Sequence, residues 1–475
     1  MPRIKSWKSG SAGEPSFAAD FDIIRHAVLQ NTDIRTNRNK YYAIELHHGK
    51  AKADYPYRVF THYGRTDDLE RNPNAGVREG RYFATLGEAE ATYQQIYRQK
   101  TSARKGYREV NLASSRIGSQ QARGASSGHV DDATLQKMNA DRASKPKPKR
   151  RVSTLSKPVQ HLVSYLYDEA THTLTSTVNA KITANGIETP LGVLTLGQVE
   201  SGQSILDEAL KVYHSRQRNK TSRLADLSGD FYTAIPHRIG RSRSAMQAAV
   251  LNSEAAFEQK QQTLQLMRDM LKVSGDGEQS VLFDPEIDRR YEALGAELKH
   301  LSSRSDEHGK IVTLMQRSLR KMRKLNIQNI YTLRRPGERS VFDKRVGNER
   351  LLMHGSRIHN WVGILSRGLL LPRVVVQLGV KRTDGGWLGH GLYFGDAACT
   401  SYYYTSPGRK GTRFIALARV ALGKMKPYRK ITYGLTAPPK GFDSCHGVRG
   451  SQFADDEYVI YRGEQQQLEY LVEIR

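Results

Sequence analysis

The sequence predicts a multidomain α+β protein that contains a small α/β module, an all-α bundle and an antiparallel α+β domain, in that order. Three observations support this prediction. The 475 residues suffice for two to four domains of roughly 100–200 residues each. Alternating apolar residues and turn residues dominate both ends of the chain, whereas a helical period of 3.6 dominates its middle. Shifts in composition mark the boundaries.

The N-terminal part is predicted to be a basic, unassigned tail over 1–39 followed by the α/β module over 40–111. The stretches "YYAIEL" and "YPYRVFTHYGR" alternate in the manner of strands. A helix is predicted over "TLGEAEATYQQIYRQKT", because Leu86, Ala89 and Tyr93 fall on one face. A last strand is predicted at "KGYREVNL".

Residues 112–152 are poor in apolar side chains and end in "ASKPKPKRRVS". Such a segment buries too little surface to offset its ordering entropy, which predicts a basic disordered linker. The basic run 145–151 fits a nuclear-import signal, a tether on nucleic acid or a solvated linker.

Residues 153–275 have the pattern of an all-α bundle. Ser156 is suited to cap a helix that has Pro158 in its first turn. An apolar stripe that includes Phe257 and Leu264 indicates a helix packed in a core rather than a cofactor site.

Residues 280–475 return to short strands, such as "ERLLMHG", "HGLYFGD", "TRFIALARVALG" and "LEYLVEI". Their alternation predicts an antiparallel sheet. The sequence has no GxGxxG before a helix and no GxxxxGK[ST], which argues against a Rossmann or P-loop nucleotide site. No Cys/His spacing suggests zinc, so no metal site is predicted.

The net charge of +26 favours a polyanionic partner, DNA or RNA, with an anionic membrane surface as the competing interpretation. The mean hydropathy is −0.61. No apolar run approaches the ~18 residues of a membrane span, and the first residues lack the apolar core of a signal peptide, so no membrane partner is predicted. The two cysteines, Cys399 and Cys445, allow one disulfide but suit a reducing interior.

Three C-terminal stretches, "LLMHGSR", "GHGLYFGDAACTSYYY" and "DDEYVIY", resemble in this order the catalytic domain of the poly(ADP-ribose) polymerase family. The stretches "SKPVQHLVSYLYD", "TPLGVLTLGQVESGQSIL" and "LADLSGDFYTAIPH" resemble its regulatory domain. "HYGR", followed by "IYRQKTSARKGY", resembles the WGR domain of its DNA-dependent members. The resemblance covers roughly 40–110 and 155–475, and it implies NAD⁺ as co-substrate and no prosthetic group.

By this resemblance, the histidine, tyrosine and glutamate that mark the family's NAD⁺ site match His354, Tyr393 and Glu457, which are the predicted catalytic residues. The predicted NAD⁺-binding residues are His354, Gly355, Ser356, Tyr393, Ser401 and Tyr404. Taken alone, a histidine such as His354 is more often a turn residue, Tyr393 would ordinarily be a strand aromatic, and Glu457 could be an exposed residue that opens a strand.

The residue types suit cleavage of the bond between ribose C1′ and nicotinamide, whose transition state resembles an oxocarbenium ion. His354 would hydrogen-bond a ribose hydroxyl, and Gly355 would let the backbone approach the carboxamide. Tyr393 and Tyr404 would stack on the flat ring. Glu457 would ease positive charge at C1′ and polarise the acceptor hydroxyl.

Two features depart from the family. Thr400 replaces a lysine that some members carry before the serine, which leaves turnover and chain length open. The stretch "GFDSCHGV" resembles vault-associated members. Some members with the same three marker residues transfer single units only.

The DNA-binding residues predicted for the N-terminal module are Tyr63, Gly64, Arg65, Lys100, Arg104 and Lys105. Tyr63 stands where the WGR name has tryptophan, an aromatic that packs on the sugar of a DNA end in the family. The basic cluster, which also includes Arg108, would contact phosphates, and its alternative is a solvated basic face.

The resulting hypothesis is a DNA-activated poly(ADP-ribose) polymerase that responds to strand breaks and modifies itself and other proteins. The helical region would cover the NAD⁺ site until DNA docking loosens it. The alternatives are a mono-ADP-ribosyltransferase and an inactive scaffold that binds nucleic-acid ends. The expected location is the nucleus in a eukaryote, or the cytoplasm and nucleoid of a bacterium.

Overall fold

A computed structural model describes residues 4–72, 74–123, 153–183, 186–237, 239, 242–272, 287–319, 324–371 and 386–475. The chain divides into two compact units: the first holds residues 1–151 and 175–264, and the second holds 152–174 and 265–475. The division passes through two helices, α3 (Lys157–Thr177) and α7 (Glu254–Lys272). Most of the predicted linker, from 124 to 152 and including the basic run 145–151, lies outside the described residues.

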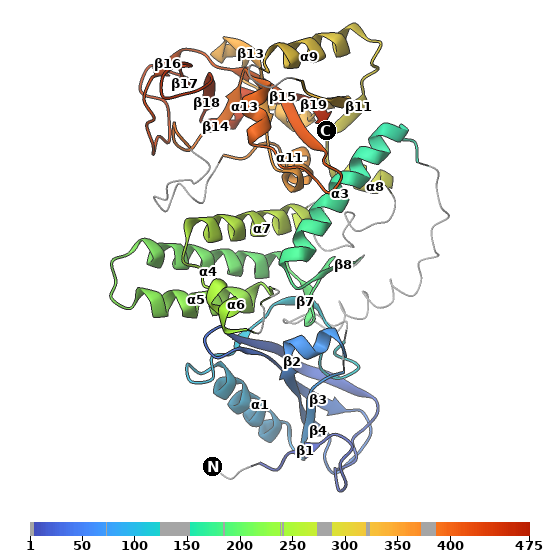
Figure 1. Ribbon diagram of the computed structural model, residues 1–475. Helices are drawn as coiled ribbons and strands as arrows, with labels where there is room; N and C mark the ends of the chain where they lie inside the picture. The colour runs from blue at the N-terminus through green and yellow to red at the C-terminus, as the bar shows by residue number, and fades with distance from the viewer. Residues whose placement is uncertain are drawn as a thin grey trace. The chain divides into compact units, whose positions relative to one another are not determined.

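The first unit contains an antiparallel sheet in the order β1-β5-β4-β3-β2-β6. Its strands are β1 (Trp7–Lys8), β2 (Phe21–Asp33), β3 (Arg38–Gly49), β4 (Tyr57–Arg65), β5 (Val77–Phe83) and β6 (Arg108–Glu109). Helix α1 (Leu86–Thr101) lies against this sheet (Figure 1). It begins at Thr85, whose hydroxyl accepts the backbone N–H of Glu88 at 3.4 Å. A short 3₁₀ turn, η1 (Thr66–Glu70), follows β4.

The predicted unassigned tail over 1–39 is wrong, because it contains strand β2. This strand pairs with β3 from Phe21 to Asp33, and Val28 and Leu29 are fully buried. A register shift between Ile23 and Arg25 breaks the alternation of the strand, so its apolar residues do not follow a single period of two. The interruption hid the strand from a pattern search.

The predicted linker is also wrong for its first residues. Strand β7 (Leu112–Ser115) belongs to a second small sheet. Beyond it, the backbone N–H of Ser119 donates to Glu45 Oε1 at 2.8 Å. Burial is the largest single influence and opposes ionisation of Glu45, but the hydrogen bonds from His47 and Ser119, together with the charges of His47 and His26, outweigh burial and lower the Glu45 pKa to about 2. A buried carboxylate therefore fixes a segment that composition alone assigns to a linker.

The helical region is not all-α. The small antiparallel sheet, ordered β7-β10-β9-β8, adds three strands from it: β8 (Lys181–Thr183), β9 (Gly186–Glu188) and β10 (Gly192–Leu194). Gly192 has φ +154°, and a Cβ there would lie 2.0 Å from the carbonyl oxygen of Ser114. Only glycine permits this approach between β10 and β7. Besides α1 and the last residues of α3, the described part of this unit contains the helices α4 (Leu196–His214), α5 (Lys220–Ala234), α6 (Arg243–Ala248) and the first part of α7.

Helix α5 packs on the end of strand β2. A Cβ on Gly229 would lie 2.5 Å from the carbonyl oxygen of Thr32, and the Thr32 N–H donates to Thr233 Oγ1 at 2.9 Å. At the rim of this contact, Arg108 Nε donates to Asp230 Oδ1 at 2.7 Å. The N-terminal module and α5 therefore belong to one packed body.

The second unit is built on a mostly antiparallel sheet in the order β11-β12-β19-β15-β13-β14-β18-β17-β16 (Figure 1). Its strands are β11 (Glu297–His300), β12 (Ile327–Arg334), β13 (Glu349–Gly355), β14 (Leu392–Gly395), β15 (Arg413–Ala421), β16 (Met425–Tyr428), β17 (Ser444–Gly447), β18 (Glu457–Ile460) and β19 (Gln466–Ile474). Strands β16 and β17 pair in parallel. The helices are α3, the end of α7, α8 (Ile287–Ala293), α9 (Asp306–Arg317), α10 (Pro336–Val341), α11 (Trp361–Arg367) and α13 (Ala398–Tyr403).

Both cysteines of this unit are buried, free thiols. Within the described residues, the helices are too short or too polar to cross a bilayer. In the same residues, no group of three or more His, Cys, Asp or Glu side chains is arranged to hold a metal ion.

Candidate active site and nucleic-acid surface

The three predicted catalytic residues lie on three adjacent strands of the second unit. His354 is in β13, Tyr393 is in β14 and Glu457 opens β18. The register aligns Met353 with Gly395, and Gly395 with Glu457. Because neighbouring strands lie ~4.8 Å apart, the backbone of Glu457 is about 10 Å from that of β13. Pairing across the sheet thus gathers residues that are a hundred positions apart in the sequence.

The ring of His354 is oriented by the neighbouring strand. Its Nδ1–H donates to the carbonyl oxygen of Tyr393 at 2.9 Å, and its ring centre lies 5.7 Å from that of Phe394. A proton on Nδ1 leaves Nε2 as the acceptor in the neutral ring. In this tautomer Nε2 can accept a hydrogen bond from a hydroxyl group, such as one of a ribose.

Gly355 and Ser401 are in contact at the end of β13. A Cβ on Gly355 would lie 1.8 Å from the carbonyl oxygen of Ser401, a distance that no side chain permits. Ser401 is 3% exposed. Glycine is therefore required here by the packing of α13, in addition to any ligand. The two residues predicted to hold the carboxamide are brought together, and the next residue, Ser356, accepts the side-chain amide of Asn360 at 3.1 Å.

The two tyrosines predicted to stack on nicotinamide differ in their surroundings. The hydroxyl of Tyr393 donates to the carbonyl oxygen of Gly389 at 2.6 Å and accepts the N–H of Leu388 at 3.0 Å. Tyr404 is the C-cap residue that follows α13, and it is 42% exposed. One ring is thus fixed by the fold, whereas the other lies at the surface of the same region.

Glu457 is a buried acid with an altered pKa. It is 7% exposed, and burial raises its pKa to about 7. A carboxyl group with a pKa near the working pH suits proton transfer and charge stabilisation, which is the pattern expected of a functional acid.

Thr400, where some family members carry lysine, lies beside a different acid. Its hydroxyl donates to Oδ2 of Asp455. This position therefore carries a neutral hydroxyl and a carboxylate rather than a cation.

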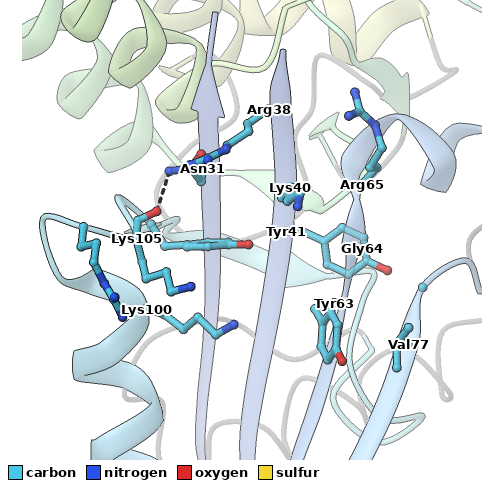
Figure 2. A pocket seen from close by; sticks show the side chains of 13 residues that line it. Asn31, Arg38, Lys40, Tyr41, Tyr63, Gly64, Arg65, Val77, Lys100 and Lys105 are labelled. Atoms are coloured by element: carbon cyan, nitrogen blue, oxygen red, sulfur yellow. Dashed lines mark hydrogen bonds between the residues drawn. The ribbon is translucent and has the colours of Figure 1, made fainter. Parts of the chain in front are cut away.

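In the first unit, the predicted DNA-binding residues line one pocket of about 610 Å³ (Figure 2). The lining residues are Asn31, Arg38, Lys40, Tyr41, Tyr63, Gly64, Arg65, Gly76, Val77, Lys100, Arg104, Lys105 and Tyr107. All six predicted residues are in this set, and its charged members are all Lys or Arg. The pocket therefore attracts anions.

Tyr41, Tyr63 and Tyr107 are among the lining residues of this pocket. The ring of Tyr63 stacks on Tyr42 with 5.3 Å between ring centres, and its hydroxyl donates to Glu79 Oε1 at 3.0 Å. The Lys100 ammonium lies 3.9 Å from the centre of the Tyr42 ring. Burial, followed by the charge of Lys105, lowers the Lys100 pKa to about 8. Lys100 is therefore built into the wall rather than freely solvated.

The cations of the pocket differ in how they are engaged. Arg65 donates to Asp67 Oδ2 at 3.0 Å and to the carbonyl oxygen of Asn37 at 3.2 Å, so part of its charge is neutralised within the module. Lys40 and Lys105 are exposed, and Figure 2 shows them entering from β3 and from the side of α1. Arg108 belongs to the contact with α5 described above.

Sequence reasoning missed Arg38 and Lys40, which line the same pocket. The basic stretch "RTNRNK" was a signal for them, but it fell in and beside the segment treated as a tail. Asn31, whose side-chain amide donates to the carbonyl oxygen of Lys105 at 3.0 Å, was missed with the strand that carries it.

Models of known protein families match three successive parts of the chain. Residues 25–114 match the WGR domain, and 153–276 match the poly(ADP-ribose) polymerase regulatory domain. Residues 305–451 match the poly(ADP-ribose) polymerase catalytic domain. This last match includes His354 and Tyr393 and ends six positions before Glu457.

Known relatives match along nearly the whole chain. The human protein mono-ADP-ribosyltransferase PARP4 is 27% identical over 96% of this chain, which spans only 24% of that protein's length. The mouse protein mono-ADP-ribosyltransferase PARP3 is 26% identical over 94% of the chain and 87% of its own length. Human poly [ADP-ribose] polymerase 2 is 24% identical over 98% of the chain and 82% of its own length.

Proposed function

This chain belongs to the poly(ADP-ribose) polymerase family, and we propose that it is an NAD⁺ ADP-ribosyltransferase whose activity is raised by DNA. The observation that carries the proposal is the buried carboxyl of Glu457, with a pKa of about 7, two strands from the oriented ring of His354. NAD⁺ is the co-substrate, and no prosthetic group is required.

In the proposed reaction the bond between ribose C1′ and the nicotinamide nitrogen breaks, and the bonding electrons leave with nicotinamide. Gly355 and Ser401 hold the carboxamide, while Tyr393 and Tyr404 flank the ring. His354 Nε2 accepts a hydrogen bond from a ribose hydroxyl. Ionised Glu457 stabilises positive charge at C1′ and takes up the proton of the acceptor hydroxyl as the new bond to C1′ forms.

A polymer of ADP-ribose is the first candidate product. Glu457 matches the glutamate with which the family's polymerising members activate a ribose hydroxyl. A single-unit product is favoured by a different observation. Thr400, where some members carry a lysine, donates a hydrogen bond to Asp455, so a neutral hydroxyl beside a carboxylate replaces the cation. The relatives include one protein named a mono-ADP-ribosyltransferase and another named a poly [ADP-ribose] polymerase. The acceptors are this protein itself and other proteins.

The proposed activator is a DNA strand break or end that binds the pocket of the first unit. Exposed Lys40 and Lys105 would contact phosphates, which positions DNA without reading its sequence. The ring of Tyr63 would pack on a terminal sugar. The protein would accordingly act where DNA is, in a nucleus or in a bacterial nucleoid.

One experiment tests the activity. Purified protein is incubated with labelled NAD⁺, with and without nicked duplex, and the products are run on a denaturing gel beside Glu457→Gln. A DNA-dependent smear that is lost in the variant is the expected result. A sharp band in the wild type assigns single-unit transfer. Absence of label from folded protein rejects the transferase and leaves a DNA-binding scaffold.

A further inference from the structure

The head group of Lys100 is surrounded by aromatic rings. This residue lies in the last turn of α1, is half-buried and lines the pocket of the first unit (Figure 2). Its ammonium lies 3.9 Å from the centre of the Tyr42 ring, 5.8 Å from that of Tyr63 and 5.7 Å from that of Tyr107. These rings take the place of much of the water that hydrates an exposed lysine, which disfavours its charged form.

The charged groups that face Lys100 are mostly cations. Lys105 beyond α1, Arg81 in β5 and Lys40 in β3 each oppose a proton on the Lys100 amine, whereas Glu79 in β5 favours one. These charges come from three separate elements of the module. The amine therefore lies in a field that is positive from several directions.

The carboxylate of Glu79 is bonded to other groups. Its Oε1 accepts the Tyr63 hydroxyl at 3.0 Å, and its Oε2 accepts Nη2 of Arg81 at 3.1 Å. Among the residues that the structure describes, Lys100 forms no ion pair with an acid. Its ammonium is thus both poorly hydrated and uncompensated.

The result is an amine that is partly neutral near physiological pH. Burial first, and then the charge of Lys105, lowers the Lys100 pKa from 10.5 to about 8. At pH 7.5 about a quarter of such an amine is neutral, compared with about one part in a thousand of an ordinary lysine. The neutral amine is the nucleophilic form.

Carbon dioxide is the electrophile that best suits these surroundings. The neutral nitrogen attacks the carbon of CO₂, a C–O π pair moves onto oxygen, and the nitrogen gives up one proton to water. The product is a carbamate anion, and no catalyst or further reactant is needed. The cations that oppose the ammonium stabilise this anion. An amide formed by acylation would be neutral and would gain nothing from them.

We propose that Lys100 is a site of reversible carbamylation by CO₂, and that the carbamate weakens binding of DNA to the pocket. The modification itself stands apart from the proposed function, whereas its effect on DNA rests on that function. The carbamate replaces a positive head group by a negative one. It would also compete with DNA phosphates for Lys105 and Lys40.

The first test locates the carbamate. Full-length protein is equilibrated with ¹³C-labelled CO₂ and bicarbonate at pH 7.5, carbamates are trapped by ethylation with a trialkyloxonium salt, and peptides are identified by mass spectrometry. Lys50 is the internal reference, because hydrogen bonds from its ammonium to Asp22 and Asp20 raise the Lys50 pKa. The adduct on Lys100 is expected to exceed that on Lys50 at least ~10-fold.

Four variants separate the amine from its surroundings. Lys100→Arg retains a positive charge but should lose the adduct, whereas the matched Lys50→Arg should retain the adduct on Lys100. Lys105→Gln removes a cation that stabilises the carbamate and should lower the Lys100 adduct severalfold, and Lys105→Arg should restore it. Circular dichroism and thermal melting identify any variant that fails to fold.

The second test measures the effect on DNA. Affinity for a labelled nicked duplex is measured by fluorescence anisotropy in CO₂–bicarbonate buffer and in chloride buffer of the same pH and ionic strength. The wild-type affinity should be about threefold or more lower with CO₂, because a phosphate contact is lost and an anion is gained. The affinity of Lys100→Arg should be the same in both buffers.

Folded protein with no adduct on Lys100, or with no more than on Lys50, overturns the modification site. An adduct that leaves the DNA affinity unchanged overturns its effect on the pocket. Failure of the proposed function looks different: the protein then binds no nicked duplex in either buffer, and the trapped adduct still decides whether Lys100 reacts with CO₂.

Discussion

The pocket of the first unit and the candidate NAD⁺ site of the second unit are built on opposite principles. The pocket gathers exposed and partly buried cations around tyrosine rings, and its members need only lie near one another. The NAD⁺ site depends on a buried acid, an oriented histidine and one glycine-to-carbonyl contact. An electrostatic surface tolerates loss of single members, whereas a site built on burial and contact does not.

The largest effect is expected at Glu457. Replacing Glu457 by Gln removes a general acid–base, which typically contributes 10²–10⁴-fold. We therefore expect NAD⁺ turnover to fall by roughly that factor while DNA affinity is unchanged. Turnover and fluorescence anisotropy on one preparation measure both. A variant that keeps more than a tenth of the activity would contradict the assigned role.

The raised pKa of Glu457 predicts that the free energy of unfolding depends on pH. The folded pKa of about 7 lies above the ordinary glutamate value of 4.5, so the stability that goes with the protonated form is complete below pH 4.5. It is lost as pH rises through 7. The loss by pH 8 is about 3 kcal/mol at most. The melting temperature of the wild type, relative to Glu457→Gln, should fall between pH 5 and 8, and a constant difference would refute the burial argument.

Gly355→Ala tests the packing of the candidate NAD⁺ site without changing any charge. A Cβ at 1.8 Å from the Ser401 carbonyl oxygen forces β13 and α13 apart, and such overpacking typically costs ~1–3 kcal/mol. We expect a lower melting temperature and weaker NAD⁺ binding by calorimetry. Gly309→Ala is the control, because nothing lies within 4 Å of a Cβ there. Equal behaviour of the two variants would show that the contact is dispensable.

The smallest effect is expected in the pocket. Lys40→Gln combined with Lys105→Gln removes two exposed cations, so the slope of log affinity for DNA against log salt should fall by ~1.8. Affinity should drop severalfold at low salt and hardly at high salt. Arg65→Gln should change the slope less, since Asp67 already pairs with Arg65. Titrations of nicked duplex at several salt concentrations measure the slopes, and an unchanged slope in the double variant would place DNA elsewhere.

Local patterns were sufficient to predict much of the architecture. The helix at Leu86, the strands near Tyr63 and the antiparallel character of the C-terminal sheet follow from alternation and period. The motif residues His354 and Tyr393 fall inside the matched catalytic domain. Their roles, and that of Glu457, stay predictions until the experiments above are done.

What could not be predicted depends on contacts between distant segments. Strand β2 was hidden by its register shift, and residues 112–123 read as linker although Glu45 bonds Ser119 across 74 positions. The buried acids Glu169 and Asp269 look like ordinary helix-surface charges in the sequence, because the glycines they pack against, Gly408 and Gly363, lie 239 and 94 positions away. A single sequence carries no signal that pairs such positions.

The packing of Gly229 on Thr32 restricts how this protein can be recombined. A gene fusion that joins its first 123 residues to the helical region of a relative would set a foreign α5 against β2. Any side chain at position 229 would meet the Thr32 carbonyl, and Arg108 would require an acid at position 230. The module and α5 are thus inherited as a matched pair, and a working chimera must exchange both or neither.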